Sequence, residues 1–204
     1  MSTQRRLFVA TGNAHKTEEI AAMLGSGWLV EDLRSQSALV SPEETGTTFE
    51  ANARIKAEAA SLELPGRWVL SDDSGLEVDV LGGEPGVYSA RYGGEGAGDA
   101  ANRERLKREL ASLPHDKENG WAARFRCCMA VARDGVTLAV FNGAVEGRVI
   151  AAEQGAGGFG YDPLFIPDGY ADTFGVLPAE TKNQLSHRAR ALAQMVPWLG
   201  TQEA

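Results

Sequence analysis

The order of apolar and polar residues predicts that the chain opens with a strand, a loop and a helix. Residues 7–10 form a short apolar run, and residues 16–24 have the mixed pattern of a helix. The loop between them, residues 11–16, is polar and contains a glycine. A strand that leads through a short loop into a helix is typical of α/β proteins.

A second helix is predicted further along, where apolar residues recur at helical spacing and Pro65 and Gly66 provide a stop. Its apolar positions are Ala51, Ile55, Ala59 and Leu62. Asn52 and Lys56 lie one turn apart on an adjacent face, and we assign both to substrate binding.

The middle of the chain predicts two strands, at residues 68–71 and 76–80, on either side of an acidic turn. A third helix follows and ends at Pro114. The apolar residues that recur on one side of this helix are Leu106, Leu110 and Leu113.

The carboxyl-terminal half predicts a long hairpin and a last helix. Residues 121–133 and 136–150 read as strands, joined at Asp134-Gly135, a dipeptide that favours a two-residue turn. Ser186 is placed to cap the last helix. The apolar stripe of that helix is Ala189, Leu192, Val196 and Leu199.

Composition narrows the class of protein. With 204 residues, 43% of them hydrophobic, the chain can form a single domain over residues 1–204. A net charge of −8 provides no general basic field for nucleic acid, so any phosphate site must be local. Cys127 and Cys128 would point to opposite faces of a strand, which disfavours a disulfide or a cysteine metal site. The amino terminus lacks an apolar stretch long enough for a signal or membrane span, so we expect a cytoplasmic protein without membrane contact.

The acidic turn, residues 71–76, is the strongest candidate for chemistry. Asp72 and Asp73 are adjacent carboxylates that follow a buried strand. Such a pair repels itself unless it shares a proton or binds a divalent cation. Taken alone, Asp-Ser-Gly more often supplies a capping aspartate in a solvated turn.

The loop at residues 11–16 predicts a phosphate site. A loop that enters a helix offers backbone N–H groups and the positive end of the helix dipole, and Thr11, Asn13 and Lys16 add side-chain donors. The loop is neither a Walker A motif nor a dinucleotide fingerprint. Without the other motifs, a simple turn followed by a solvated lysine fits better.

Glu43 and Glu44 precede the helix that carries Asn52 and Lys56. Acidic residues in this place often interact only with the helix dipole. Beside Asp72 and Asp73, however, they would supply the carboxylates that Mg²⁺ takes in addition to water and phosphate oxygens.

Two other carboxylate chemistries fit less well. Aspartic proteases need two Asp-Ser-Gly turns, and this chain has one, although a homodimer could supply a second. That interpretation also leaves the basic residues without a role. Glycoside hydrolysis needs carboxylates on both sides of a sugar ring, which adjacent residues cannot easily provide.

A glycine-rich segment, residues 157–163, predicts a pocket for a planar ligand. Phe159 can stack on a ring, and Asp162 can accept a hydrogen bond from a ring N–H. Lys182, His187 and Arg188 add donors, which favour a base with an oxygen at position 6 over adenine. Phe159 alone would also fit a glycine-rich turn with a core aromatic residue.

Five motifs, in order along nearly the whole chain, resemble the Ham1/RdgB family of inosine triphosphate pyrophosphatases, or XTP/dITP diphosphatases. They are Thr11-Gly12-Asn13-x-x-Lys16, the Ser-Asp-Asp-Ser-Gly-Leu run at 71–76, the segment at 83–92, Gly-Phe-Gly-Tyr-Asp-Pro at 158–163, and Ser186-His187-Arg188. Departures at residues 172–177 and 180–182 leave the site residues intact and affect only the path of that loop.

The resemblance implies a Mg²⁺-dependent homodimer that hydrolyses ITP, dITP and XTP to the nucleoside monophosphate and pyrophosphate, and so cleanses the nucleotide pool. It implies an α/β fold with a mixed, strongly curved central sheet flanked by helices and two lobes around a cleft. Asp73 would be the general base, with Glu43 or Glu44 beside it on the metal, and Ser74 would contact substrate. The triphosphate would lie on Thr11, Gly12, Asn13, Ala14, His15 and Lys16, and the base on Phe159, Gly160, Tyr161, Asp162, Lys182, His187 and Arg188.

A nucleotide-binding sensor that uses the same pocket without turnover is the alternative from another functional class. Asp72 and Asp73 argue against it, because a pure binder gains nothing from negative charge beside a triphosphate.

Overall fold

The computed structural model describes residues 5–36, 39, 41–114 and 120–202. The chain divides into two compact units. The first comprises Met1–Asp73, Cys127–Gly143 and Arg188–Ala204, and the second comprises Ser74–Arg126 and Ala144–His187. Each unit is therefore assembled from segments that are far apart in the sequence.

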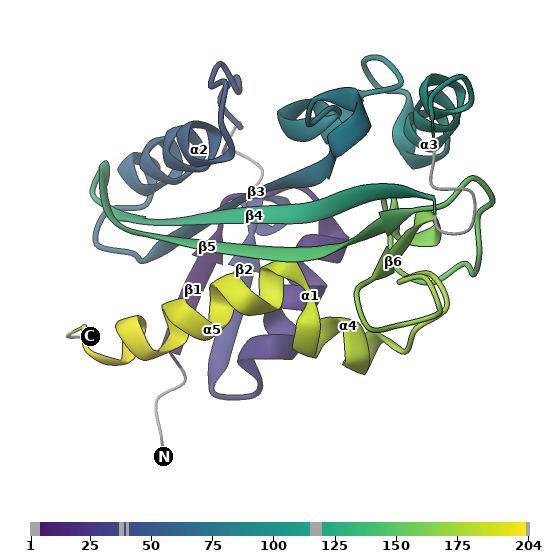
Figure 1. The fold of residues 1–204 in the computed structure, drawn as a ribbon. Helices are drawn as coiled ribbons and strands as arrows, with labels where there is room; N and C mark the ends of the chain where they lie inside the picture. Colours follow the sequence, from purple (N-terminus) through teal and green to yellow (C-terminus); the bar gives the residue numbers. More distant parts are fainter. Residues whose placement is uncertain (1–4, 37–38, 40, 115–119, 203–204) are drawn as a thin grey trace. The chain divides into compact units, whose positions relative to one another are not determined.

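The strands form one six-stranded sheet in the order β2-β1-β3-β4-β5-β6 (Figure 1). β1 (Arg5–Val9) is parallel to its neighbours β2 (Trp28–Asp32) and β3 (Val69–Val78), whereas β5 (Val136–Val149) is antiparallel to β6 (Phe165–Pro167). The predicted α/β class with a mixed central sheet and flanking helices is confirmed. The placement of two lobes around a cleft stays a prediction.

In the first unit, helices cover both faces of the sheet (Figure 1). α2 (Phe49–Glu63) packs on the face of β4 (Trp121–Arg133) that carries Cys128, Ala130 and Ala132. α1 (Ala14–Leu24) and α5 (His187–Gly200) pack on the face that carries Cys127, Met129 and Val131. The two cysteines are free thiols in separate clusters, as the alternation of a strand predicts.

The predicted apolar stripe of α2 is wrong. Leu62 is 63% exposed, although the spacing placed it in the core. The buried positions are Asn52, Ala53, Lys56, Ala57, Ala60 and Ser61. Small alanines allow the helix to approach the sheet closely, and the two longer polar side chains find partners there.

The stripe of α5 is wrong in part. Val196 is 38% exposed, whereas Leu192 and Leu199 are buried as predicted. Ala191 and Met195 complete the buried face. Ser186 directly precedes the helix and ends α4 (Ala179–Leu185).

The acidic run differs most from its prediction, because it is not a turn. β3 continues without a break from Val69 to Val78, and Asp72 and Asp73 are 1% and 6% exposed. A strand can bury adjacent carboxylates only where each has charged or hydrogen-bonding partners. Those partners come from distant segments, so the sequence pattern did not reveal the strand.

The predicted hairpin between β4 and β5 is confirmed. Its turn residues, Asp134 and Gly135, have φ values of 51° and 80°, the backbone that a two-residue primed turn requires. Short 3-10 helices occupy other connections, at Leu33–Ser35, Asp79–Leu81, Gly86–Arg91 and Asp162–Leu164.

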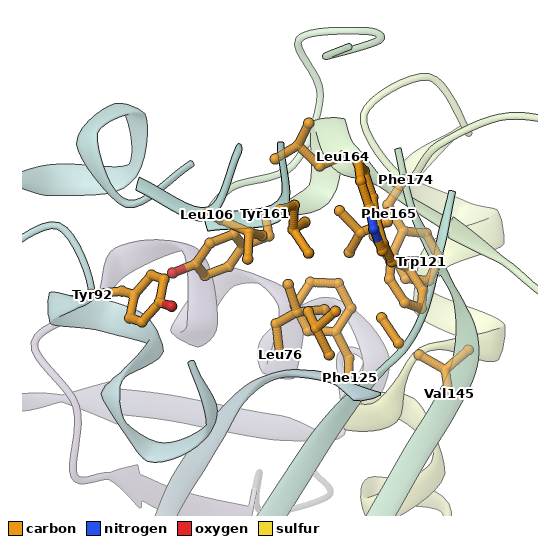
Figure 2. Packing of buried hydrophobic residues seen from close by; sticks show 14 residues of the cluster. Leu76, Tyr92, Leu106, Trp121, Phe125, Val145, Tyr161, Leu164, Phe165 and Phe174 are labelled. Carbon is orange, nitrogen blue, oxygen red and sulfur yellow. The ribbon is translucent and has the colours of Figure 1, made fainter. Parts of the chain in front are cut away.

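The second unit has an aromatic core, which Figure 2 shows from close by. The ring of Phe125 lies 4.7 Å from that of Phe165 between centroids. α3 (Gly98–Leu110) contributes Leu106 and Leu110 to this core, as predicted from its stripe. Leu113 packs against the same cluster just beyond the helix.

Within the described ranges, no helix has the length and apolar character that crossing a membrane requires.

Replacing Ala57 by Leu should lower the free energy of unfolding by about 1–3 kcal/mol, because the added atoms must enter a tight contact between α2 and β4. Urea unfolding of the purified protein measures the change. Leu62→Ala is the control and should change stability by no more than about 0.5 kcal/mol, as expected for an exposed position. The reverse order of effects would mean that the sequence stripe, and not the observed face, describes the packing of α2.

Candidate active site

β3 directs its two adjacent aspartates to opposite faces of the sheet. Leu70 packs in the cluster that contains α1 and α5, and Val69 packs with Ala60 of α2. Since alternate residues of a strand share a face, Asp72 faces α1 and α5, and Asp73 faces α2. The two carboxylates therefore meet different partners.

Asp72 is buried at the centre of a charge cluster. Its Oδ2 accepts hydrogen bonds from Nε of Arg188 at 3.1 Å and from Sγ of Cys127 at 3.0 Å. Its Oδ1 accepts from Nη2 of Arg188 at 3.3 Å and forms an ion pair with Lys16. Burial alone would raise the pKa of Asp72, but the charges of Arg188 and Lys16 hold it well below its usual value.

These contacts change the expected roles of two residues. Both oxygens of Asp72 are engaged by Arg188, Cys127 and Lys16, which gives this carboxylate a structural role, and its assignment to the metal stays a prediction. Arg188 lies in the first unit, where it pairs with Asp72 and Glu19. Its assignment to reading the base stays a prediction that none of these contacts supports.

Asp73 has a different environment. Its Oδ1 lies 2.9 Å from Nζ of Lys56, and its Oδ2 accepts from Nδ2 of Asn52 at 3.3 Å. Burial raises the pKa of Asp73, although the charge of Lys56 opposes the shift. A carboxylate with a raised pKa accepts a proton more readily, which suits a general base.

Two lysines converge on a single backbone oxygen. Nζ of Lys16 and Nζ of Lys56 lie 3.3 and 3.1 Å from the carbonyl oxygen of Asp72. β1 ends before it reaches the level of Asp72 on β3. Just beyond its end, the N–H of Ala10 donates to the carbonyl of Leu70 at 2.7 Å, so the Asp72 carbonyl is left to accept from the lysines. Helices from both faces thus place two ammonium groups at the carboxyl end of β1, where ligands of α/β proteins commonly bind.

The loop at residues 11–16 differs in part from the predicted phosphate cradle. Asn13 caps α1, and its Oδ1 accepts from the N–H groups of His15 and Lys16 at 3.0 and 3.4 Å. Thr11 Oγ1 accepts from the N–H of Asn13. These backbone donors are thus already engaged, and Lys16 is the side chain of this loop that reaches the site.

Asn52 ties the acidic loop to Asp73. Its Oδ1 accepts from the N–H of Gly46 at 2.8 Å, while its amide group donates to Asp73. A Cβ atom at Gly46 would lie 2.6 Å from Oδ1 of Asn52, so the contact requires glycine. Glu44, in this loop, places Oε1 2.8 Å from Nζ of Lys56.

The donor set suits Mg²⁺ with Glu44 and not Glu43. Glu44 and Asp73 both reach Nζ of Lys56, so two carboxylates converge on one point, whereas Glu43 is exposed. Mg²⁺ commonly takes one or two carboxylates and completes its shell with water and phosphate oxygens. Among the residues that the structure describes, no group of three or more acidic, histidine or cysteine side chains could hold a metal by itself.

In the second unit, Asp162 holds the glycine-rich segment in place. It is 2% exposed, and its Oδ2 accepts from Nζ of Lys182 at 2.6 Å and from the N–H of Phe159 at 2.8 Å. Nζ of Lys182 lies 4.7 Å from the centre of the Phe159 ring. The structure therefore brings together three of the residues predicted for the base pocket, with Asp162 as an internal acceptor.

Two further residues predicted for the pocket, His187 and Tyr161, have partners inside the second unit. The His187 ring stacks on Phe125 at 5.0 Å between centroids. The hydroxyl of Tyr161 donates to the carbonyl of Ser89 at 2.9 Å, and Ser74 is a half-buried residue of β3. Their contacts with a nucleotide stay predictions.

Sequence reasoning missed Cys127 and Glu19. The thiol of Cys127 donates to Asp72, and burial raises its pKa well above the usual value. Glu19 pairs with Arg188 across 169 positions of sequence. The only signals were that Glu19 lies one turn after Lys16 in the predicted helix, and that Cys127 occupies one face of a predicted strand.

Asp72→Asn should lower the free energy of unfolding by about 3–5 kcal/mol, because it leaves the buried guanidinium of Arg188 to pair with Glu19 and removes the anion that pairs with Lys16. Chemical unfolding at pH 7, without metal or nucleotide, measures the loss. Glu50→Gln is the matched control; it removes a carboxylate from a surface pair with Arg54 and should cost at most about 1 kcal/mol. Equal effects of the two substitutions would contradict a structural role for Asp72.

Comparison with known proteins places the chain in a family. The model described as "Ham1 family" matches residues 7–198. A dITP/XTP pyrophosphatase of Halalkalibacterium halodurans is 46% identical over 192 residues, which cover 94% of this chain and 97% of that protein. The dITP/XTP pyrophosphatase of Geobacter sulfurreducens is 46% identical over 198 residues, covering 97% and 98%.

Solved structures agree with this result. The Staphylococcus aureus Ham1 protein has a TM-score of 0.82 and 35% identity, covering 98% of this chain and 100% of that one. A HAM1 protein from Coxiella burnetii has a TM-score of 0.84 and 32% identity, covering 97% and 100%. With its acidic strand, paired lysines and glycine-rich segment, this chain belongs to the Ham1 family.

Proposed function

We propose that this chain hydrolyses the deaminated purine nucleoside triphosphates dITP, XTP and ITP to the nucleoside monophosphate and pyrophosphate. The relatives named dITP/XTP pyrophosphatases match nearly their full length and support this substrate class. One observation of the structure carries the proposal. Lys16 and Lys56 converge beside Asp73, so a buried carboxylate with a raised pKa lies next to two cations.

In the proposed reaction, Asp73 takes a proton from a water molecule as the water oxygen attacks the α-phosphorus. A new P–O bond forms, and the bond from the α-phosphorus to its bridging oxygen breaks, which releases pyrophosphate. Lys16 and Lys56 stabilise the charge that collects on this leaving group. Lys56 also orients Asp73, and Asn52 holds the second oxygen of that carboxylate.

We also propose that the enzyme requires Mg²⁺, with Glu44 and Asp73 as its protein ligands. Bound there, the ion would neutralise oxygens of the triphosphate. A homodimer in the cytoplasm completes the proposal, which the motifs shared with the family support. Size-exclusion chromatography of the purified chain tests the dimer directly.

The purified protein should release pyrophosphate, and not orthophosphate, as the first product from ITP, dITP or XTP. EDTA should abolish the release, and added Mg²⁺ should restore it, because the carboxylates of Glu44 and Asp73 repel the phosphate oxygens unless a divalent cation binds both. A pyrophosphate assay with a separate orthophosphate assay measures both products. Nucleotide binding without turnover would instead favour the nucleotide-binding sensor.

Asp73→Asn should lower kcat by roughly two or more powers of ten, the scale of a lost general base, and more if Asp73 also holds the metal. Substrate should still bind, because Lys16 and Lys56 remain. Steady-state kinetics with ITP measures the loss, and Glu50→Gln on the surface of α2 serves as the charge-matched control. Turnover near the wild-type rate in the Asn variant would place the base elsewhere.

A further inference from the structure

α3 of the second unit carries a row of charged residues that face the glycine-rich segment. Asp99, Arg103 and Lys107 follow one another at four-residue spacing and therefore lie on one side of the helix. A neighbouring side of α3 is fixed to the core through Leu106 and Leu110, whose cluster Figure 2 shows. Asn102 adds hydrogen bonds to the Gly93 N–H and the Ala90 carbonyl. The helix that carries the charged row is therefore fixed to the rest of the second unit.

Asp99 and Arg103 form hydrogen bonds with both the N–H and the carbonyl group of Gly160. The N–H of Gly160 donates to Oδ2 of Asp99 at 2.7 Å, and Nη1 of Arg103 donates to the carbonyl of Gly160 at 2.9 Å. Both contacts are charge-assisted hydrogen bonds, which are stronger than neutral ones. They fix the peptide groups on either side of Gly160.

The second half of the row holds the other end of the segment. Nε of Arg103 lies 3.0 Å from Oε2 of Glu153, and Nζ of Lys107 lies 3.1 Å from Oε1 of the same residue. Arg103 therefore contacts both Glu153 and Gly160. The chain between them includes three glycines and ends at Phe159.

Glycine-rich backbone loses more conformational freedom on ordering than other backbone. A segment of this kind presents Phe159 in a defined direction only if other residues restrain it. Asp162 restrains the N–H of Phe159, and the row on α3 restrains the residue that follows it.

We propose that Asp99 and Arg103 are positioning residues for recognition of the base. They hold the segment that carries Phe159 in its binding conformation before the nucleotide arrives, so binding does not have to order it. The inference rests on the proposed function, because it takes the segment at Phe159 as the site of the base.

The kinetic test compares Arg103→Met with Arg108→Met. Arg108 lies on the exposed side of the same helix, so both variants lose one arginine from α3. Arg103→Met should raise KM for ITP by roughly tenfold, the scale of one charge-assisted hydrogen bond, with kcat nearly unchanged. Arg108→Met should change neither constant.

Inorganic tripolyphosphate, used as a competitive inhibitor, separates positioning from general damage. It carries phosphates without a base, so its inhibition constant should be the same for the wild type and for Arg103→Met. Equal weakening of ITP and tripolyphosphate would overturn the proposal, as would an unchanged KM for ITP.

Asp99→Ala provides a second variant at an exposed position and should also raise KM, whereas Asp99→Asn keeps an oxygen that can accept from Gly160 and should recover part of the loss. Hydrogen exchange of the amides at residues 157–162 gives a readout without turnover. Exchange should be faster in Asp99→Ala and Arg103→Met than in Arg108→Met. A wild-type protein inactive on ITP would overturn the proposed function alone, while unchanged exchange in both variants would overturn the positioning by α3.

Discussion

The structure of the candidate active site depends on the two-residue alternation of β3. Because Asp72 and Asp73 are consecutive in an unbroken strand, they cannot face the same side of the sheet. Asp72 meets Arg188 and Lys16, and Asp73 meets Lys56. Two neighbouring carboxylates that would repel each other in a turn are thereby separated by the sheet and neutralised by different helices.

This separation gives the two carboxylates different chemistry. Asp72 is buried and connects α1, β4 and α5 to β3, and its lowered pKa keeps the carboxylate charged. Asp73 has a raised pKa beside Lys56, and Glu44 shares the same ammonium group. β3 thus supplies a structural carboxylate, Asp72, on one face and a candidate base, Asp73, on the other. The ion pair with Asp72 also positions Lys16 near the carbonyl oxygen of Asp72.

Close packing of α2 makes the second face possible. Alanines at the contact with β4 let α2 approach the sheet closely. The side chains of Asn52 and Lys56 can therefore reach Asp73 from within the helix. In the second unit, Asp162 performs a comparable task for the glycine-rich segment by accepting from the N–H of Phe159 and from Lys182. In both units a buried polar side chain orders the groups that we assign to substrate.

The sequence by itself determined the α/β class and the hairpin at Asp134-Gly135, and it named Lys16, Lys56 and Asp73, which the structure brings together, because apolar periodicity, turn residues and motifs are local signals. It did not determine that the acidic run is a strand, that Leu62 is exposed or that Arg188 pairs with Asp72. Local pattern places a carboxylate pair in solvent, where isolated charges are stable. Only the tertiary structure brings residues from distant segments to those charges, and this pairing makes a buried acidic strand favourable.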